Sequence, residues 1–229
     1  TLRLRLLDGA GEVIAENTYT AMIAGPEFIA AERPVRVPAN DAMRRSPLGE
    51  SLAASGFDLA ADAEGEIRLY ADPGAAEWRE IIDFAENGGI AWVQDPKSVE
   101  ALRRWLGDGH LARSNNEGEC AHVPGRRSPL LSGLEKYDLT WWAHPRKRPH
   151  TYGNHYIEFT EPPPQSFEPL LKQIPPHYYS TNWRVRYPLA MIQVGTGSVV
   201  VSTLNFEGSA RDPAPARFAR NLLAWLMAR

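Results

Sequence analysis

The chain opens with apolar and polar residues in strict alternation. Leu2, Leu4 and Leu6 are separated by Arg3 and Arg5. A period of two predicts a β-strand that has one face in water. The segment therefore reads as part of a sheet that is covered on one side only.

A turn at 8–11 leads into a second strand-like stretch, which includes Val13, Ala15 and Tyr19. An isolated pair of strands is only marginally stable in water. We therefore expect residues 1–24 to be the closing strands of a β-sandwich domain whose other strands precede them. Residues 25–34 are expected to form a linker.

From residue 35 the pattern changes to short apolar strands that alternate with helices. The strand candidates are Val35–Val37, Phe57–Leu59, Ile67–Tyr70 and Ile90–Val93. Ser46 and Pro47 have the capping hydroxyl and the first-turn proline of a helix start. An apolar stripe from Trp78 to Ala85 predicts a second helix, and Ser98 begins a third.

The second half is less regular until its end. Residues 110–128 are polar and contain glycine, which predicts a loop. Residues 189–194 and 198–204 flank a glycine turn and predict a hairpin. A last apolar stripe, from Phe218 to Leu226, predicts the final helix.

Alternating strands and helices favour a largely parallel sheet that has helices on both faces. We expect residues 35–229 to form an α/β domain with a flavodoxin-like or class I amidotransferase-like sheet. The C-terminal hairpin would add antiparallel strands at its edge. The N-terminal β-hairpin would be a remnant of the preceding domain.

Composition narrows the classes of partner. The 229 residues are 43% hydrophobic, which allows one large domain, and the formal net charge is −3. A nucleic-acid-binding protein usually has a basic surplus, and the basic run 146–148 is interpreted as a solvated loop. No apolar run approaches the roughly 18 residues of a membrane span. We expect neither nucleic acid nor membrane as a partner.

In such folds the active site lies at the carboxyl ends of the strands. A nucleophile would sit on a sharp turn directly after a central strand. The turn after Val93 instead reads Gln94-Asp95-Pro96-Lys97 and has neither Cys nor Ser. We therefore expect no catalytic residue in this chain.

Cys120 is the sole cysteine, which excludes an intrachain disulfide and a zinc site built on cysteines. His122 is nearby, but no strand-turn-helix pattern surrounds the pair, so we interpret Cys120 as incidental rather than as a nucleophile.

His150 and His155 lie five positions apart across a glycine, a spacing that fits ligands on neither a helix nor a strand. We give them, and His144, structural or surface roles, and we expect no metal and no cofactor. Glu158 and Glu161 are interpreted as surface charge rather than as the carboxylate pair of a glycosidase.

Aromatic residues gather in one third of the chain. Exposed aromatic rings stack on sugars and anchor protein interfaces, whereas buried ones fill cores. Core packing is the leading interpretation for the group as a whole. The candidates for contact with carbohydrate or with another domain are Trp141, Trp142, Tyr152 and Trp183.

Several stretches resemble parts of known enzymes. Residues 2–8 and 11–17 resemble the closing strands of the immunoglobulin-like β-sandwich of glycoside hydrolase family 2. The amidotransferase-like domains appended to such β-glycosidases are similar to residues 86–93, 128–134, 138–142, 197–203 and 220–223. The resemblance covers most of the chain.

This resemblance implies a multi-domain β-glycosidase as the parent protein, with its catalytic glutamates on a (β/α)₈ barrel that this chain does not match. We expect a non-catalytic C-terminal module that packs on other domains of the parent enzyme or mediates homo-oligomerisation. Carbohydrate is a further candidate partner. The alternatives are an independent amidotransferase-like hydrolase that uses Cys120 and an aromatic-lined carbohydrate-binding module.

Overall fold

The computed structural model describes residues 2–19, 26–30, 35–113, 121–122, 128–134, 155–173, 185–207 and 212–229. Cys120 and the four aromatic candidates Trp141, Trp142, Tyr152 and Trp183 lie outside these ranges. Their proposed roles stay predictions.

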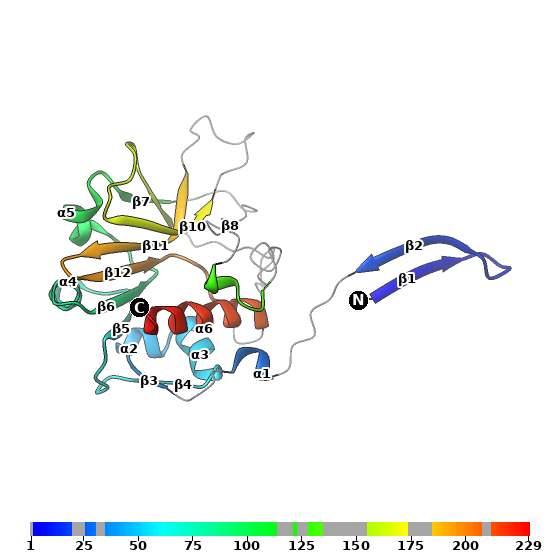
Figure 1. Cartoon of the computed structure of the whole chain (residues 1–229), viewed down its shortest axis with the longest axis horizontal. Helices are drawn as coiled ribbons and strands as arrows, with labels where there is room; N and C mark the ends of the chain where they lie inside the picture. Colours follow the sequence, from blue (N-terminus) through cyan, green and yellow to red (C-terminus); the bar gives the residue numbers. More distant parts are fainter. Residues whose placement is uncertain are drawn as a thin grey trace.

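The N-terminal segment forms the hairpin that the alternation predicts. Strands β1 (Leu2–Leu7) and β2 (Val13–Tyr19) pair antiparallel. The carboxylate of Asp8 accepts the backbone N–H groups of Ala10 and Glu12, at 2.9 Å each, and so holds the turn. In Figure 1 the hairpin lies apart from the α/β body. Its membership of a β-sandwich stays a prediction.

The expected linker contains a helical turn, α1 (Pro26–Ile29). The guanidinium group of Arg217 lies 5.2 Å from the ring centre of Phe28 and donates a hydrogen bond to the backbone oxygen of the same residue. Residues 26–29 therefore pack against the C-terminal helix. That residues 25–34 link two domains stays a prediction.

Ten further segments form the strands of the α/β body. They are β3 (Val35–Pro38), β4 (Phe57–Ala60), β5 (Ile67–Ala71), β6 (Ile90–Gln94), β7 (His110–Arg113), β8 (Ala121–His122), β9 (His155–Glu158), β10 (Phe167–Gln173), β11 (Arg186–Val194) and β12 (Gly197–Ser202). The main sheet has the order β5-β6-β12-β11-β10-β8, with β7 and β9 attached through β11. The parallel pair β3–β4 adjoins β5 through a bridge between Ala39 and Leu69.

We expected the C-terminal hairpin at the edge of the sheet. It lies instead in the middle of the sheet. Strand β12 pairs parallel with β6 on one side and antiparallel with β11 on the other. All its residues are buried, which explains its continuous apolar run. A Cβ on Gly195, in the turn, would lie 2.7 Å from Cα of Glu86, so this tight approach requires glycine.

Helices cover both faces of the sheet, as predicted. The helical elements are α2 (Asp41–Arg44), α3 (Pro47–Ala54), α4 (Ala75–Glu86), η1 (Glu100–Leu102), α5 (Arg103–Leu106), η2 (Pro129–Leu131) and α6 (Pro213–Met227). Trp92 of β6 packs in the core formed with α3 and α6, whereas its neighbours Ala91 and Val93 pack in the core formed with α4. No helix in the described ranges has the length and apolar character to cross a bilayer.

Two predictions in the second half are wrong, and one strand is missing from them. Residues 110–113, expected in a loop, form β7 and pair with β9. Glu158, expected at the surface, is buried and forms an ion pair of 2.7 Å with Arg186. Strand β10 is a further element that the sequence pattern did not show. These polar-looking segments become strands because neighbouring strands pair with them, which local pattern does not record.

Candidate functional site

Two aspartates stand side by side at the carboxyl edge of the sheet. Strand β5 ends at Ala71 and is followed by Asp72, while β6 ends at Gln94 and is followed by Asp95. Ala71 and Gln94 are partners in the parallel register. Since neighbouring strands lie about 4.8 Å apart, the register brings Asp72 and Asp95 next to one another.

Both aspartates adopt a left-handed backbone conformation, with φ of 44° at Asp72 and 47° at Asp95. They are the two non-glycine residues with positive φ among those described. Each still donates its N–H along the sheet, Asp72 to Gln94 O at 3.2 Å and Asp95 to Ser202 O at 2.6 Å. Aspartate tolerates this conformation better than most residues, and such positions gather at ligand sites.

The aspartates line a cavity of about 580 Å³. Its wall also includes Lys97, His155 and Asn205, and its apolar part includes Leu48, Leu204 and Phe206. Pockets that bind small molecules occupy roughly 300–1,000 Å³ and lie at this edge in open α/β sheets. We call this cavity the carboxyl-edge pocket.

Gln94 lines the pocket and has a buried, unsatisfied acceptor. The residue is 6% exposed, and its Nε2 donates to the backbone oxygen of Leu204 at 2.7 Å. Its Oε1 is buried and has no hydrogen-bond partner among the described residues. Leaving a buried acceptor unpaired costs about 1–3 kcal/mol, so a ligand or water that donates a hydrogen bond here is favoured.

The two aspartate carboxylates of the pocket differ in their charged partners. The ammonium group of Lys97 forms an ion pair with Asp72. Burial against the cavity wall raises the pKa of Asp95, and the Asp72 carboxylate adds to the rise, while His155 and Lys97 oppose it. The Asp95 side chain still reaches solvent, so it is open to a ligand. Of the two carboxylates, Asp72 has the charged partner, and Asp95 takes a proton more readily than an ordinary aspartate.

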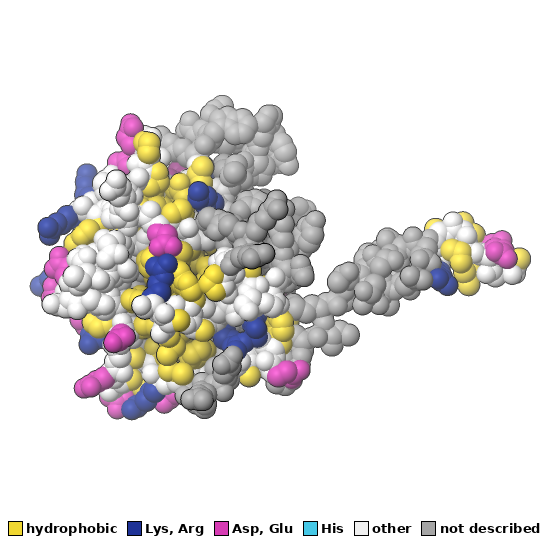
Figure 2. All heavy atoms as spheres, viewed as in Figure 1, with side chains coloured by type: hydrophobic (Ala, Val, Ile, Leu, Met, Phe, Trp, Pro, Cys, Tyr) yellow, Lys and Arg dark blue, Asp and Glu magenta, His cyan; other side chains and the backbone are white. Residues whose placement is uncertain are grey.

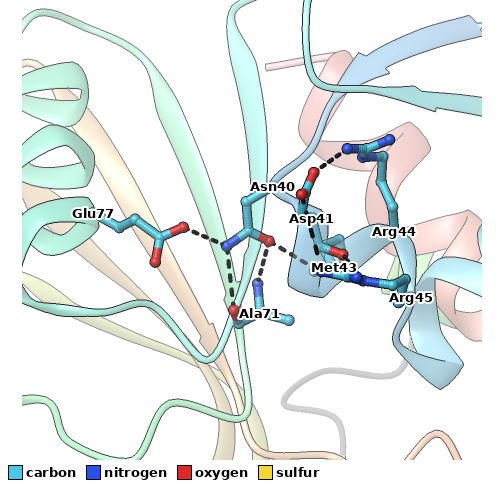
Figure 3. Close-up of polar contacts among 7 residues, drawn as sticks. All are labelled: Asn40, Asp41, Met43, Arg44, Arg45, Ala71 and Glu77. Atoms are coloured by element: carbon cyan, nitrogen blue, oxygen red, sulfur yellow. Dashed lines mark hydrogen bonds and ion pairs between the residues drawn. The ribbon is translucent and has the colours of Figure 1, made fainter.

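Asn40 fixes the backbone that carries Asp72 (Figure 3). Its Oδ1 accepts from the N–H of Met43 at 2.8 Å, which caps α2, and from the N–H of Ala71 at 3.2 Å. Its Nδ2 donates to Ala71 O at 3.3 Å and to Glu77 Oε1 at 2.7 Å. One side chain thus ties the end of β5 to α2 and α4.

The sequence pattern locates the correct turn but does not predict the pair of aspartates, Asp72 and Asp95. The turn after β6 was identified as the place where a nucleophile would lie and was interpreted as empty, and His155 was given a structural or surface role. The structure places Asp95 and His155 in the wall of the same pocket. A signal was present, because an Asp-Pro dipeptide follows each of two predicted strands, at 72–73 and at 95–96. No group of metal-ligating side chains occurs in the described part of the chain.

The pocket combines hydrogen-bond acceptors with apolar lining residues. It contains no Cys or Ser at the turn after β6, where an amidotransferase-like nucleophile would stand. The groups present are suited to holding a ligand that donates several hydrogen bonds.

Searches with family models and among curated proteins found no match. Among solved structures, cytoplasmic protein STM1381 from Salmonella typhimurium LT2 is similar at a TM-score of 0.50 and 11% identity, over 99% of this chain and 96% of that one. A ThuA-like protein from Parabacteroides merdae is similar at a TM-score of 0.48 and 10% identity, over 86% and 90% of the two chains.

A β-galactosidase from Bacillus circulans sp. alkalophilus is similar over 85% of this chain, at 11% identity and a TM-score of 0.47. This chain spans 30% of the length of that enzyme. Glycosidases and ThuA-like proteins thus both occur among its structural neighbours, at low identity. At such identities the likeness concerns the fold alone, which is α/β with a mixed sheet.

Proposed function

We propose that the chain is a non-catalytic ligand-binding module of a protein that acts on glycosides, and that its carboxyl-edge pocket takes a small, neutral, hydroxyl-rich ligand such as a sugar. The observation that carries this proposal is the buried, unpartnered Oε1 of Gln94 beside the two register-matched aspartates. One amide oxygen and two carboxylates at neighbouring strand ends fit a ligand that donates hydrogen bonds from adjacent positions.

The charge of the pocket favours a neutral ligand over an anion. Asp72 and Asp95 stand at its wall with Glu207, while Lys97 is already engaged by Asp72. An anionic group would meet these carboxylates at short range, which is unfavourable where water is partly excluded. Sugar hydroxyls donate to carboxylates without bringing charge.

The apolar lining residues of the pocket fit the C–H face of a sugar ring. Leu48 and Leu204 are 1% exposed and Phe206 is 3% exposed, so these side chains are fixed by packing. A pyranose ring has one face of C–H groups and a rim of hydroxyls. The pocket is lined by both acceptors and apolar side chains, Phe206 among them, and this mixed lining suits such a ligand.

Titration calorimetry of the full chain with methyl β-D-glucoside and methyl β-D-galactoside tests the proposal. Gln94→Leu is expected to weaken binding at least tenfold, since the ligand loses its buried acceptor. Gln193→Leu is the matched control, because Gln193 is an exposed glutamine that donates to the backbone oxygen of Gly195 at 3.2 Å. Absence of binding at millimolar sugar, or equal effects of the two variants, would refute the proposal.

The proposal that this chain is not catalytic has a separate test. As a binding module, the chain is expected not to hydrolyse chromogenic β-glycosides. Turnover that Asp95→Asn abolishes would contradict this and would identify the aspartate pair as an acid–base site.

The accessory role is supported by the hairpin β1–β2. Leu6, Leu7, Val13 and Ile14 are between 49% and 63% exposed, and Figure 2 shows apolar side chains on this hairpin. Several large apolar residues on one hairpin are typical of a surface that packs against another domain. The double variant Leu6→Ser with Ile14→Ser is expected to reduce self-association, measured by analytical ultracentrifugation, or binding to the other domains of the parent protein, measured by co-purification. If both kinds of association are unchanged, the result counts against this role.

A further inference from the structure

A second cavity lies beside the carboxyl-edge pocket. It measures about 630 Å³ and lies between α4 and residues 97–101. Its apolar wall includes Pro73, Ala75, Trp78 and Ile82. We call it the α4 groove.

The two cavities share one boundary. Asp72 and Lys97 line both of them, and their side chains form an ion pair. The Asp72 side chain is 45% exposed and that of Lys97 is 83% exposed. Exposed ion pairs of this kind contribute little to stability. A ligand that lies across the pair can therefore displace Lys97 at small cost.

The chemistry of the cavities differs. The carboxyl-edge pocket presents buried and partly buried acceptors, whereas the wall of the α4 groove is formed largely by carbon atoms of Trp78, Ile82 and Ala101. Arg79 and Glu100 lie at the groove as charged residues of opposite sign. A single ligand that fits both cavities must have a hydroxyl-rich part and an apolar part joined by a short link.

We propose that the two cavities form one cleft and that its ligand is a glycoside, with the sugar ring in the carboxyl-edge pocket and an apolar aglycone in the α4 groove. The link between the two parts lies over the Asp72–Lys97 pair. This inference rests on the proposed sugar site and adds the class of substituent that the sugar carries.

Paired ligands test the inference on the full chain. Affinities of methyl and phenyl β-D-glucoside, and of the same pair of β-D-galactosides, are measured by titration calorimetry. Since buried apolar surface contributes about 25 cal/mol per Å², the phenyl glycoside is expected to bind at least tenfold more tightly than the methyl glycoside. Equal affinities of the methyl and phenyl glycosides would overturn the inference and leave the sugar site intact.

A variant in the groove locates the effect. Ala75 is an exposed residue of the groove wall at the start of α4, and Ala76 is its exposed neighbour outside the groove. Ala75→Glu is expected to reduce the phenyl-to-methyl affinity ratio to near one, whereas Ala76→Glu leaves the ratio unchanged. A ratio that persists in Ala75→Glu would place the aglycone elsewhere and refute the inference. Failure of every glycoside to bind would refute both the inference and the proposed sugar site.

Discussion

Replacement of Asn40 by alanine is expected to destabilise the fold strongly for a residue that is only partly buried. The change removes four hydrogen bonds, two accepted by Oδ1 from Met43 and Ala71, and two donated by Nδ2 to Ala71 and Glu77. These bonds link the end of β5 to α2 and α4 (Figure 3).

The magnitude follows from the separate contacts. Loss of a helix N-cap costs about 1 kcal/mol. A neutral hydrogen bond contributes about 1 kcal/mol and one to a charged group about 1.5–3 kcal/mol. The bonds of Asn40 to Ala71 are long, at 3.2 and 3.3 Å, and water can replace part of the bond to Glu77. We therefore expect the free energy of unfolding to fall by about 3 kcal/mol.

Urea unfolding followed by circular dichroism measures this difference. Asn87→Ala is the matched control, since Asn87 is exposed and its Nδ2 makes one hydrogen bond, of 2.7 Å, to Asp83 O. It is expected to cost less than about 1 kcal/mol. Asn40→Asp keeps the helix cap but places a second carboxylate next to that of Glu77. Its cost should fall between those of Asn40→Ala and Asn87→Ala. Equal losses in Asn40→Ala and Asn87→Ala would refute the bracing role.

Three further predictions concern single side chains. Asp95→Asn is expected to stabilise the protein at pH 7, by less than about 1 kcal/mol because the side chain reaches solvent. Burial raises the pKa of Asp95 in the folded protein, so ionisation of this one group costs stability; the cost is absent below the ordinary aspartate pKa and appears as pH rises through the raised pKa. Urea midpoints that differ equally at pH 4 and pH 7 would contradict the shift. Gly195→Ala should cost more than about 1 kcal/mol in thermal or urea unfolding, since its φ is 60° and its Cβ would meet Glu86, and a neutral effect would show that the turn relaxes. Glu158→Gln should cost about 1.5–3 kcal/mol because the part-buried hydrogen bond from Arg186 loses its charged acceptor; a loss below about 1 kcal/mol in the same assay would argue that the pair is solvated.

The strongest local patterns predicted the fold well. Ile90 to Val93 is continuously apolar because helices cover both of its faces, and the stripe from Trp78 to Ala85 marks the helix on one of them. Pairing between distant strands is not encoded in such patterns. The position of β12 beside β6 and the recruitment of β7 by β9 could not be predicted, because each depends on a partner far away in the sequence.

The site was predicted only in part for the same reason. The turn at Gln94 and Asp95 could be located from the strand that precedes it. That Asp72 stands beside Asp95 depends on the register between β5 and β6, and the unpartnered state of Gln94 Oε1 depends on the packing of Leu204. The repeated Asp-Pro dipeptide was the one clue that the sequence itself contained.

The central position of β12 has a consequence for synthesis on the ribosome. The hydrogen bond from Gln94 to Leu204 joins residues 110 positions apart. Strand β6 can pair with the earlier β5 but lacks its second neighbour, β12, until that later segment has left the exit tunnel. The nascent chain must therefore hold an apolar strand with an open edge while more than a hundred residues are added. Such long-range closure slows folding and exposes unpaired strand edges to other chains. During translation this chain should depend on chaperones that shield the edge of β6.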